Sequence, residues 1–190
     1  MQVIEPRYSA DFLDSQAADN LLSVLMSQVS WQRESFRIFG RECLVPRYSA
    51  WFGDRGSSYS YTNLSHKGSG WPTYLLDVLH LVNDAANGQF NFVILNRYDH
   101  GQHHMGWHRD DEVGIDALIA SLSLGAPRRF RIQRQGEDAQ SYDLGHGSLL
   151  CFDGRDRHTL SKTKKAVDLR INLTFRKVAP DSRKESGKDT

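Results

Sequence analysis

From residue 90 onward, apolar side chains recur at every second position, and this period constrains the fold more than any other feature of the sequence. Phe90, Phe92 and Ile94 share one face of such a run with Asn96 and Tyr98. Strand-like runs occupy residues 90–98, 118–124, 129–133, 147–152 and 169–177, with glycine, proline and aspartate between them. Several short strands of this kind predict an antiparallel double sheet, either a barrel or a sandwich.

Two segments before residue 90 have the three-and-four spacing of a helix with one buried face. The first follows Asp14 and Ser15, either of which can cap it. Its apolar face comprises Ala18, Leu21, Leu22, Leu25, Met26 and Val29. The second begins near Pro72 and ends at Asn87-Gly88, a pair that favours a helix terminus. We therefore predict a mostly β fold with some α structure, an α+β protein whose helices precede most of its strands.

The composition fits one folded domain. The chain has 190 residues, of which 39% are hydrophobic and 25% charged, and this excludes a disordered protein. We expect a single domain over residues 1–178 and a disordered tail over the polar residues 179–190. Lysine and arginine total 24 against 23 aspartates and glutamates, so binding of nucleic acid would depend on local patches.

The sequence also carries expectations about location. No run approaches the roughly 18 apolar residues of a membrane span, and no apolar block follows a basic start. Cys43 and Cys151 are too few for a disulfide scaffold. We expect an intracellular monomer, cytoplasmic or, in a eukaryote, nuclear, that makes no contact with a membrane.

His108 and Asp110 form the first candidate for chemistry. They lie two positions apart, so in extended chain both side chains project to the same side. His158 follows the strand-like run 147–152 and can supply a third ligand. Two histidines and one carboxylate leave open positions on a metal, as in non-haem Fe(II) oxygenases. A motif this short also arises by chance, and structural roles for these residues stay open.

The last run, 169–176, divides its side chains between two faces. One face is apolar, and the other carries Arg170, Asn172, Thr174 and Arg176. Two arginines on one face usually indicate a solvated surface. Asn96 and Tyr98, however, lie on the apolar face of their own run, so polar groups can instead converge inside a cavity. A small dicarboxylate would satisfy such groups.

These motifs together resemble the AlkB family of Fe(II)- and 2-oxoglutarate-dependent dioxygenases. Asn96-Arg97-Tyr98, His108-Arg109-Asp110, His158 and the string from Arg170 to Arg176 stand in the family's order and approximate spacing. The similarity extends from about residue 36 to 177. It implies a double-stranded β-helix, or jelly roll, with helices and a substrate-recognition lid in about 1–89 and the jelly-roll core in about 90–178.

The resemblance also implies the chemistry. His108, Asp110 and His158 would hold Fe(II) and act in catalysis, and the residues for the co-substrate 2-oxoglutarate would be Asn96, Tyr98, Arg170, Asn172 and Arg176. With dioxygen, such a site demethylates N1-methyladenine and N3-methylcytosine oxidatively and releases formaldehyde. The expected partner is alkylated DNA, in duplex form, with the base extruded. Two alternatives stay open: an RNA demethylase of the same chemistry, and a non-enzymatic jelly-roll module that binds nucleic acid.

Phe39 is the candidate for opening the duplex. It lies beside Gly40 at the turn of a predicted hairpin over residues 36–45, which resembles the finger of duplex-acting family members. An aromatic side chain there suits a wedge that enters the space a base has left. The alternative is that Phe39 packs in the core.

Other residues are candidates for contact with the base or the DNA backbone. Tyr59 and Tyr61 share one face of an extended segment and would either surround the base or pack the lid. Arg109, Asp111 and Glu112 adjoin the metal motif, and we expect Asp111 to contact the cationic lesion, although acidic pairs are usually solvated. Two basic clusters can contact phosphates: Arg128, Arg129, Arg131 and Arg134, and Lys162, Lys164 and Lys165.

Overall fold

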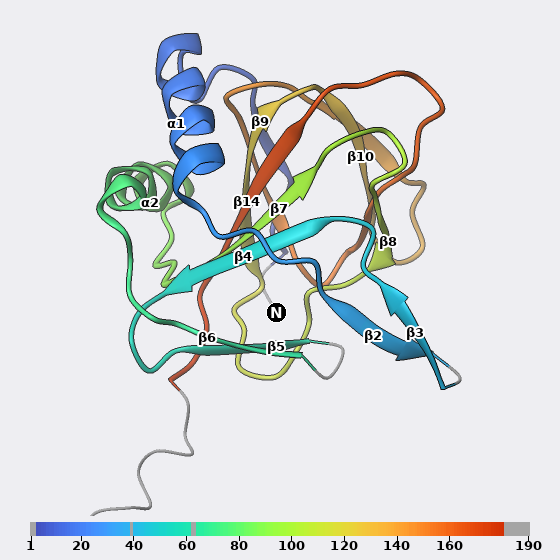
Figure 1. Cartoon of the computed structure of the whole chain (residues 1–190), viewed down its shortest axis with the longest axis horizontal. Coiled ribbons are helices and arrows are strands. Elements are labelled where there is room, and N and C mark those ends of the chain that lie inside the picture. Colours follow the sequence, from blue (N-terminus) through green and yellow to red (C-terminus); the bar gives the residue numbers. More distant parts are fainter. Residues whose placement is uncertain (1–2, 39, 62–63, 181–190) are drawn as a thin grey trace, which may run out of the picture.

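The structure is a computed structural model that describes residues 3–38, 40–61 and 64–180 (Figure 1). Two antiparallel sheets form its body. The major sheet has the order β1 (Arg7–Ser9), β12 (Ser148–Asp153), β9 (Leu118–Gly125), β14 (Arg170–Arg176), β7 (Phe92–Tyr98) and β4 (Tyr48–Gly53). The minor sheet has the order β11 (Gln140–Leu144), β10 (Arg128–Gln133), β13 (Arg157–Leu160) and β8 (Met105–His108). The two sheets make the predicted jelly roll.

Two hairpins extend from this body (Figure 1). The first pairs β2 (Ser35–Ile38) with β3 (Arg41–Leu44), and the second pairs β5 (Ser58–Tyr61) with β6 (Leu64–Lys67). Gly40 has a φ of +78° between β2 and β3, a conformation that glycine adopts without strain. The hairpin predicted over residues 36–45 is therefore confirmed.

Both predicted helices are present, α1 (Ser15–Gln28) and α2 (Thr73–Ala86). Asp14 is the cap of α1, since its Oδ1 accepts a hydrogen bond from the backbone N–H of Ala17 at 2.8 Å. Asn87 ends α2 with a left-handed φ of 50°. Met26 was expected in the core but is 37% exposed, because it lies at the flank of the apolar stripe centred on the other α1 residues.

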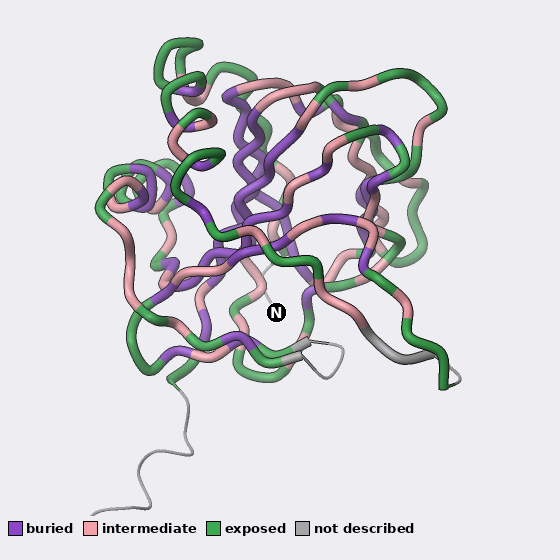
Figure 2. The backbone as a smooth tube through the Cα atoms, in the orientation of Figure 1, coloured by how far each residue is buried: buried purple, intermediate pink, exposed green. Residues whose placement is uncertain are grey.

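The main core lies between the helices and the outer face of the major sheet. Leu21 and Leu25 of α1 and Leu79 of α2 belong to the same buried cluster as Leu173 and Leu95 of the central strands. Figure 2 shows buried residues concentrated along these central strands. Phe90 was expected on the inward face of β7, yet it precedes that strand and packs in this outer core, where its ring lies 6.3 Å from that of Phe175.

Several expected boundaries differ in the structure. β1 and β4 come from the first half of the chain, yet they complete the major sheet, so the core is not confined to residues 90–178. The tail expected from residue 179 does not include Ala179, whose N–H donates to Gly114 O at 2.7 Å, or Pro180, which bridges Ser57. Residues 181–190 lie outside the described part of the chain.

No helix in the described ranges is long and apolar enough to cross a membrane. Cys43 and Cys151 are both free thiols.

Candidate active site

The inner face of the major sheet carries polar side chains at the position where the two sheets enclose a cavity. Arg170, Asn172, Thr174 and Arg176 alternate along β14 and are between 2% and 8% exposed, so they line a cavity and not a solvated surface. Their partners across the β14–β7 ladder are in register: Tyr98 lies opposite Arg170, and Asn96 lies opposite Asn172. The cavity encloses about 450 Å³, its mouth included.

Three possible metal ligands meet at one end of this cavity. β8 and β13 are neighbours in the minor sheet, and their pairing places His108 directly opposite His158. The Nε2 atom of His108 lies 3.7 Å from Asp110 Oδ1, and that of His158 lies 3.9 Å from Asp110 Oδ2. All three ligand atoms lie within 4.8 Å of one another. A Cβ at Gly154 would lie only 2.9 Å from the backbone oxygen of Asp110, so glycine is required for this close approach.

Backbone carbonyls fix the tautomer of both imidazoles. Nδ1 of His108 lies 2.9 Å from Gly106 O, and Nδ1 of His158 lies 2.9 Å from Asp156 O. A carbonyl can only accept a hydrogen bond, so each Nδ1 carries the proton and each Nε2 presents a lone pair toward Asp110. This arrangement orients both histidines as metal ligands.

Burial and charge set the ionisation of the triad. Burial lowers the pKa of His158 to about 4 and also lowers the pKa of His108, so both rings are neutral near pH 7. Burial alone would raise the pKa of Asp110, but the charge and the hydrogen bond of the Arg176 guanidinium hold it below its usual value. Arg176 Nη2 donates a hydrogen bond to Asp110 Oδ2. The site therefore presents two neutral imidazoles and an ionised carboxylate, a donor set that suits Fe(II).

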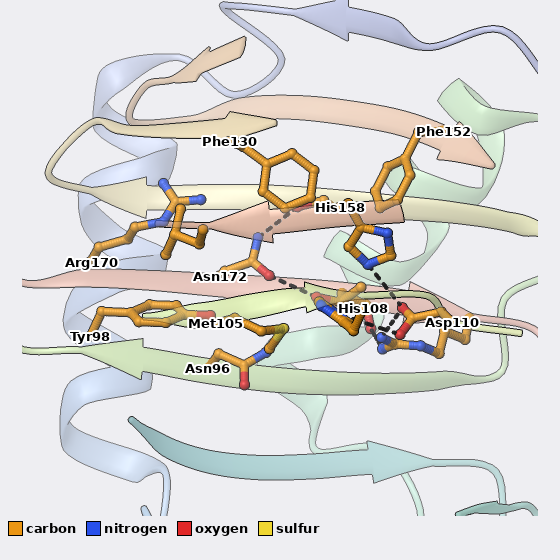
Figure 3. Close-up of a pocket in the computed structure, with 14 residues that line it drawn as sticks. Asn96, Tyr98, Met105, His108, Asp110, Phe130, Phe152, His158, Arg170 and Asn172 are labelled. Carbon is orange, nitrogen blue, oxygen red and sulfur yellow. Dashed lines mark hydrogen bonds and ion pairs between the residues drawn. The ribbon is translucent and has the colours of Figure 1, made fainter. Parts of the chain in front are cut away.

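The opposite end of the cavity is cationic (Figure 3). Arg170 is 2% exposed and donates to Ser123 Oγ at 2.8 Å and to Leu144 O at 3.2 Å. Its Nε has no partner, and no carboxylate pairs with it in the described ranges. Burial lowers its pKa to about 10, so the surroundings disfavour the cation. The Tyr98 hydroxyl beside it, whose pKa burial raises, also lacks a hydrogen-bond partner among the described residues.

The two asparagines between these ends are held differently. The Asn172 amide is fully engaged: Nδ2 donates to Ser121 Oγ at 2.7 Å and to Leu122 O at 3.1 Å, and Oδ1 accepts from Thr174 Oγ1 at 2.7 Å. Asn96 Oδ1 accepts a hydrogen bond from Arg47 Nε at 2.7 Å, which leaves its Nδ2 without a partner in the described structure. Asn96 can therefore donate to a bound anion.

A second chamber of about 430 Å³, open solvent included, meets the first at His108 and Asp110, which line both. Tyr59, Arg47, Arg109 and Glu112 line it without lining the inner cavity. The Tyr59 hydroxyl donates to Glu112 Oε2 at 3.4 Å, and the Arg176 guanidinium lies 4.9 Å from the centre of the Tyr59 ring. Burial raises the pKa of Glu112. The outer chamber thus combines an aromatic ring with a half-buried carboxylate.

The predicted substrate residues are only partly brought together. Tyr59, Arg109 and Glu112 line the outer chamber, whereas Asp111 is exposed and does not, so the chamber carboxylate is Glu112. The segment after Asp110 is irregular, and the alternation that favoured Asp111 does not apply to it. Phe39 and the side chain of Tyr61 lie outside the described residues.

The first basic cluster does not form one patch. Arg128 is 5% exposed and donates to Ser161 O at 2.8 Å. Arg129 pairs with Asp143 at 3.0 Å, and Arg134 pairs with Glu5 at 3.0 Å. Of the four arginines, Arg131 alone makes neither a hydrogen bond nor an ion pair within the described ranges. The cluster of Lys162, Lys164 and Lys165 is exposed, as expected.

Sequence reasoning missed Arg47 as a site residue. It follows the β2–β3 hairpin and is 9% exposed. Its contact with Asn96 joins positions 49 residues apart, and no local pattern predicts such a pairing.

Comparison with known proteins agrees with this geometry. The family model of the 2OG-Fe(II) oxygenase superfamily matches residues 6–176. DNA oxidative demethylase ALKBH2 of Bos taurus is 33% identical over 185 residues, which cover 88% of this chain and 66% of that protein. Alpha-ketoglutarate-dependent dioxygenase alkB homolog 3 of Homo sapiens is 30% identical over 191 residues, which cover 90% of this chain and 65% of that protein. The chain therefore spans about two thirds of the length of these relatives.

A solved structure described as "The structure of OsALKBH1" superposes with a TM-score of 0.65 at 16% identity, covering 90% of this chain and 97% of that one. A 2OG-Fe(II) oxygenase family oxidoreductase from Burkholderia pseudomallei gives a TM-score of 0.64 at 12% identity and covers 92% of this chain and 86% of that one. At such low identity these structures support the fold alone.

Proposed function

The chain belongs to the AlkB family of the 2OG-Fe(II) oxygenase superfamily, and from this premise we propose that it is a dioxygenase that oxidatively demethylates alkylated bases in DNA. The relatives named DNA oxidative demethylase ALKBH2 support the choice of DNA. The favoured substrates are N1-methyladenine and N3-methylcytosine. We propose that the protein acts as a monomer, because one chain supplies every residue of the site.

One observation carries this proposal: two members of a His-Asp-His triad, His108 and Asp110, line both of two adjoining chambers. The inner chamber ends in a buried guanidinium without an anion, and the outer chamber holds an aromatic ring and a carboxylate. The triad would therefore lie between the co-substrate in the inner chamber and the base in the outer chamber. A non-enzymatic nucleic-acid-binding module would gain nothing from burying Arg170 unpaired, which costs stability.

The residues present fit both Fe(II) and 2-oxoglutarate. His108, Asp110 and His158 would hold the metal through two lone pairs and one carboxylate oxygen. The unpartnered Nε of Arg170 and the Tyr98 hydroxyl fit the distal carboxylate of 2-oxoglutarate. When bound together, Fe(II), 2-oxoglutarate and dioxygen supply the oxidation of an N-linked methyl group, which leaves as formaldehyde.

Other residues of the inner chamber position these groups. Arg176 holds Asp110 ionised and occupies its Oδ2, which leaves Oδ1 for the metal. Asn96 donates its free Nδ2 toward the co-substrate, and Arg47 fixes which way that amide faces. The Asn172 amide is already hydrogen-bonded to Ser121 and Thr174. Its main role is therefore to hold the wall of the inner chamber in shape and not to bind 2-oxoglutarate directly.

The outer chamber selects the base. N1-methyladenine and N3-methylcytosine are cations, and the Glu112 carboxylate would gain Coulomb attraction and a hydrogen bond from them. Burial raises the pKa of Glu112, and a cationic base lowers it again, so binding and ionisation favour each other. Tyr59, which contacts Glu112, helps to hold that carboxylate in place.

The preferred form of the substrate is duplex DNA. The β2–β3 hairpin is followed by Arg47, which contacts Asn96 in the site, and in the sequence Phe39 stands between its two strands, next to Gly40. An aromatic wedge has most value in a duplex, because only there must a partner base be kept in place after its neighbour is extruded.

The test is a demethylation assay on matched oligonucleotides, single-stranded DNA, duplex DNA and RNA, each with one N1-methyladenine and with Fe(II) and 2-oxoglutarate added or withheld. Turnover that needs both additions and is fastest on duplex DNA supports the proposal, and faster repair of RNA would contradict it. Phe39→Ala should slow repair of the duplex more than that of the single strand. Leu44→Ala, an exposed apolar change on the same hairpin, is the matched control.

A further inference from the structure

Trp107 occupies an unusual position on strand β8. Neighbouring side chains of a strand point to opposite faces, so His108 faces the cavity while Trp107 lies on the outer face of the minor sheet, 37% exposed. The Arg131 guanidinium lies 5.5 Å and the Arg157 guanidinium 5.4 Å from the centre of its indole ring. These arginines come from β10 and β13, so three adjacent strands contribute to one cluster.

The charge of this cluster is not neutralised within the described structure. Arg131 and Arg157 make no hydrogen bond or ion pair there, and each guanidinium lies over the indole ring of Trp107. Nearby arginines behave differently, since Arg129 is paired with Asp143 and Arg155 with Asp153. A guanidinium stacked on an aromatic ring keeps the N–H groups at its edge available for an acceptor. Two ordered cations with free donors suit an anionic partner.

The cluster also lies beside the entrance to the active site. β8 is the edge strand of the minor sheet, and the segment before it is joined to the lid: His104 N–H donates to Pro46 O at 3.1 Å, just after β3. Arg109, two residues beyond Trp107, lines the outer chamber. A strand whose base enters that chamber would therefore pass close to the outer face of β8.

We propose that Trp107, Arg131 and Arg157 form a clamp for the sugar-phosphate backbone of the DNA strand next to the extruded base. This inference rests on the proposed function, since it takes DNA as the substrate. Trp107 holds the two guanidiniums in place, and the guanidiniums donate to phosphate oxygens. Contacts of this kind position the strand and carry no sequence information.

Binding of a fluorescent duplex with one N1-methyladenine, and of the same duplex without the methyl group, tests the clamp over a range of salt concentrations. Arg131→Gln and Arg157→Gln should each weaken binding of both duplexes about fivefold and lower the slope of log Kd against log salt by about one. Arg129→Gln removes the same charge from the same strand as Arg131, but from a residue that already has a carboxylate partner. It should change binding much less.

Trp107→Leu separates a clamp from simple surface charge. It should weaken binding in the wild-type background and have no further effect when both arginines are glutamine, because its role is to hold them. Wild-type affinities in the two arginine variants, or an equal loss in Arg129→Gln, would overturn the clamp. Demethylation of the N1-methyladenine duplex by the wild-type protein is measured in parallel. If the wild-type protein does not demethylate it, the proposed function fails, whatever the binding data say about the clamp.

Discussion

Replacement of Arg170 by methionine removes a buried cation with little change in side-chain volume, and it should affect stability and co-substrate binding in different ways. Burial lowers the pKa of Arg170 from its ordinary value to about 10, which means that the surroundings disfavour the cation by about 3 kcal/mol. The substitution removes this cost together with two hydrogen bonds, to Ser123 and Leu144, of about 1 kcal/mol each. We therefore expect the free energy of unfolding without ligand to change by no more than about 2 kcal/mol.

The effect on 2-oxoglutarate should be much larger. A charge-assisted hydrogen bond to the distal carboxylate is worth about 1.5 to 3 kcal/mol, so the affinity should fall roughly 10- to 150-fold in Arg170→Met. Calorimetry without oxygen measures this affinity, and urea unfolding measures stability. The control ligand is 2-oxobutyrate, which lacks the distal carboxylate and should lose little. Unchanged affinity for 2-oxoglutarate, or an equal loss for 2-oxobutyrate, would refute the assignment of Arg170.

Three further predictions follow from the site. Because the pKa of His158 is about 4 in the folded metal-free protein against 6.5 in the unfolded chain, the unfolded chain takes up the proton first as the pH falls. The free energy of unfolding should then drop by about 3 kcal/mol between pH 6.5 and 4, and His158→Asn should lack this part of the slope in urea unfolding. Glu112→Gln should lower kcat/KM on cationic lesions about tenfold more than on neutral N1-methylguanine. Asp111→Asn, at an exposed position, should affect cationic and neutral lesions alike. Equal losses on all lesions in Glu112→Gln would show that Glu112 does not select the base. Arg47→Met should raise the KM for 2-oxoglutarate about tenfold with little change in kcat, because Arg47 orients the Asn96 amide. If Arg47→Met raises this KM again in a protein that already carries Asn96→Ala, Arg47 does not act through Asn96.

The strands with regular apolar alternation could be predicted from the sequence. β7, β9, β12 and β14 begin and end within two residues of the expected positions, because each buries an apolar face against the helices or the minor sheet. The helices could be predicted equally well. Asp14 caps the start of α1 with its side chain, and Asn87 ends α2 in a left-handed conformation, so both signals are local in the sequence.

The strands of the site were harder to predict. β8 and β13 face the cavity with His108 and His158, and β8 exposes Trp107, which reverses the usual pattern of apolar inside and polar outside. β11, with the sequence Gln-Ser-Tyr-Asp-Leu, is an edge strand with mostly exposed side chains. A period-two search for apolar residues does not find such strands.

The candidate site divides in the same way. The pair His108 and Asp110 and the arginines of β14 lie in compact motifs, whereas His158 is a single residue 48 positions after Asp110. The choice between Asp111 and Glu112 depends on the path of an irregular segment, and the contact of Arg47 with Asn96 depends on tertiary packing. Neither can be derived from spacing alone.

The central claim is that the triad couples consumption of 2-oxoglutarate to removal of the methyl group. The most direct measurement is the yield of succinate and formaldehyde from a duplex oligonucleotide with one N1-methyladenine, with Fe(II), 2-oxoglutarate and dioxygen present. We expect equal amounts of both products for each base repaired, and neither product from His108→Ala, Asp110→Ala or His158→Ala. Repair without succinate, or substantial repair by any of these three variants, would contradict the account.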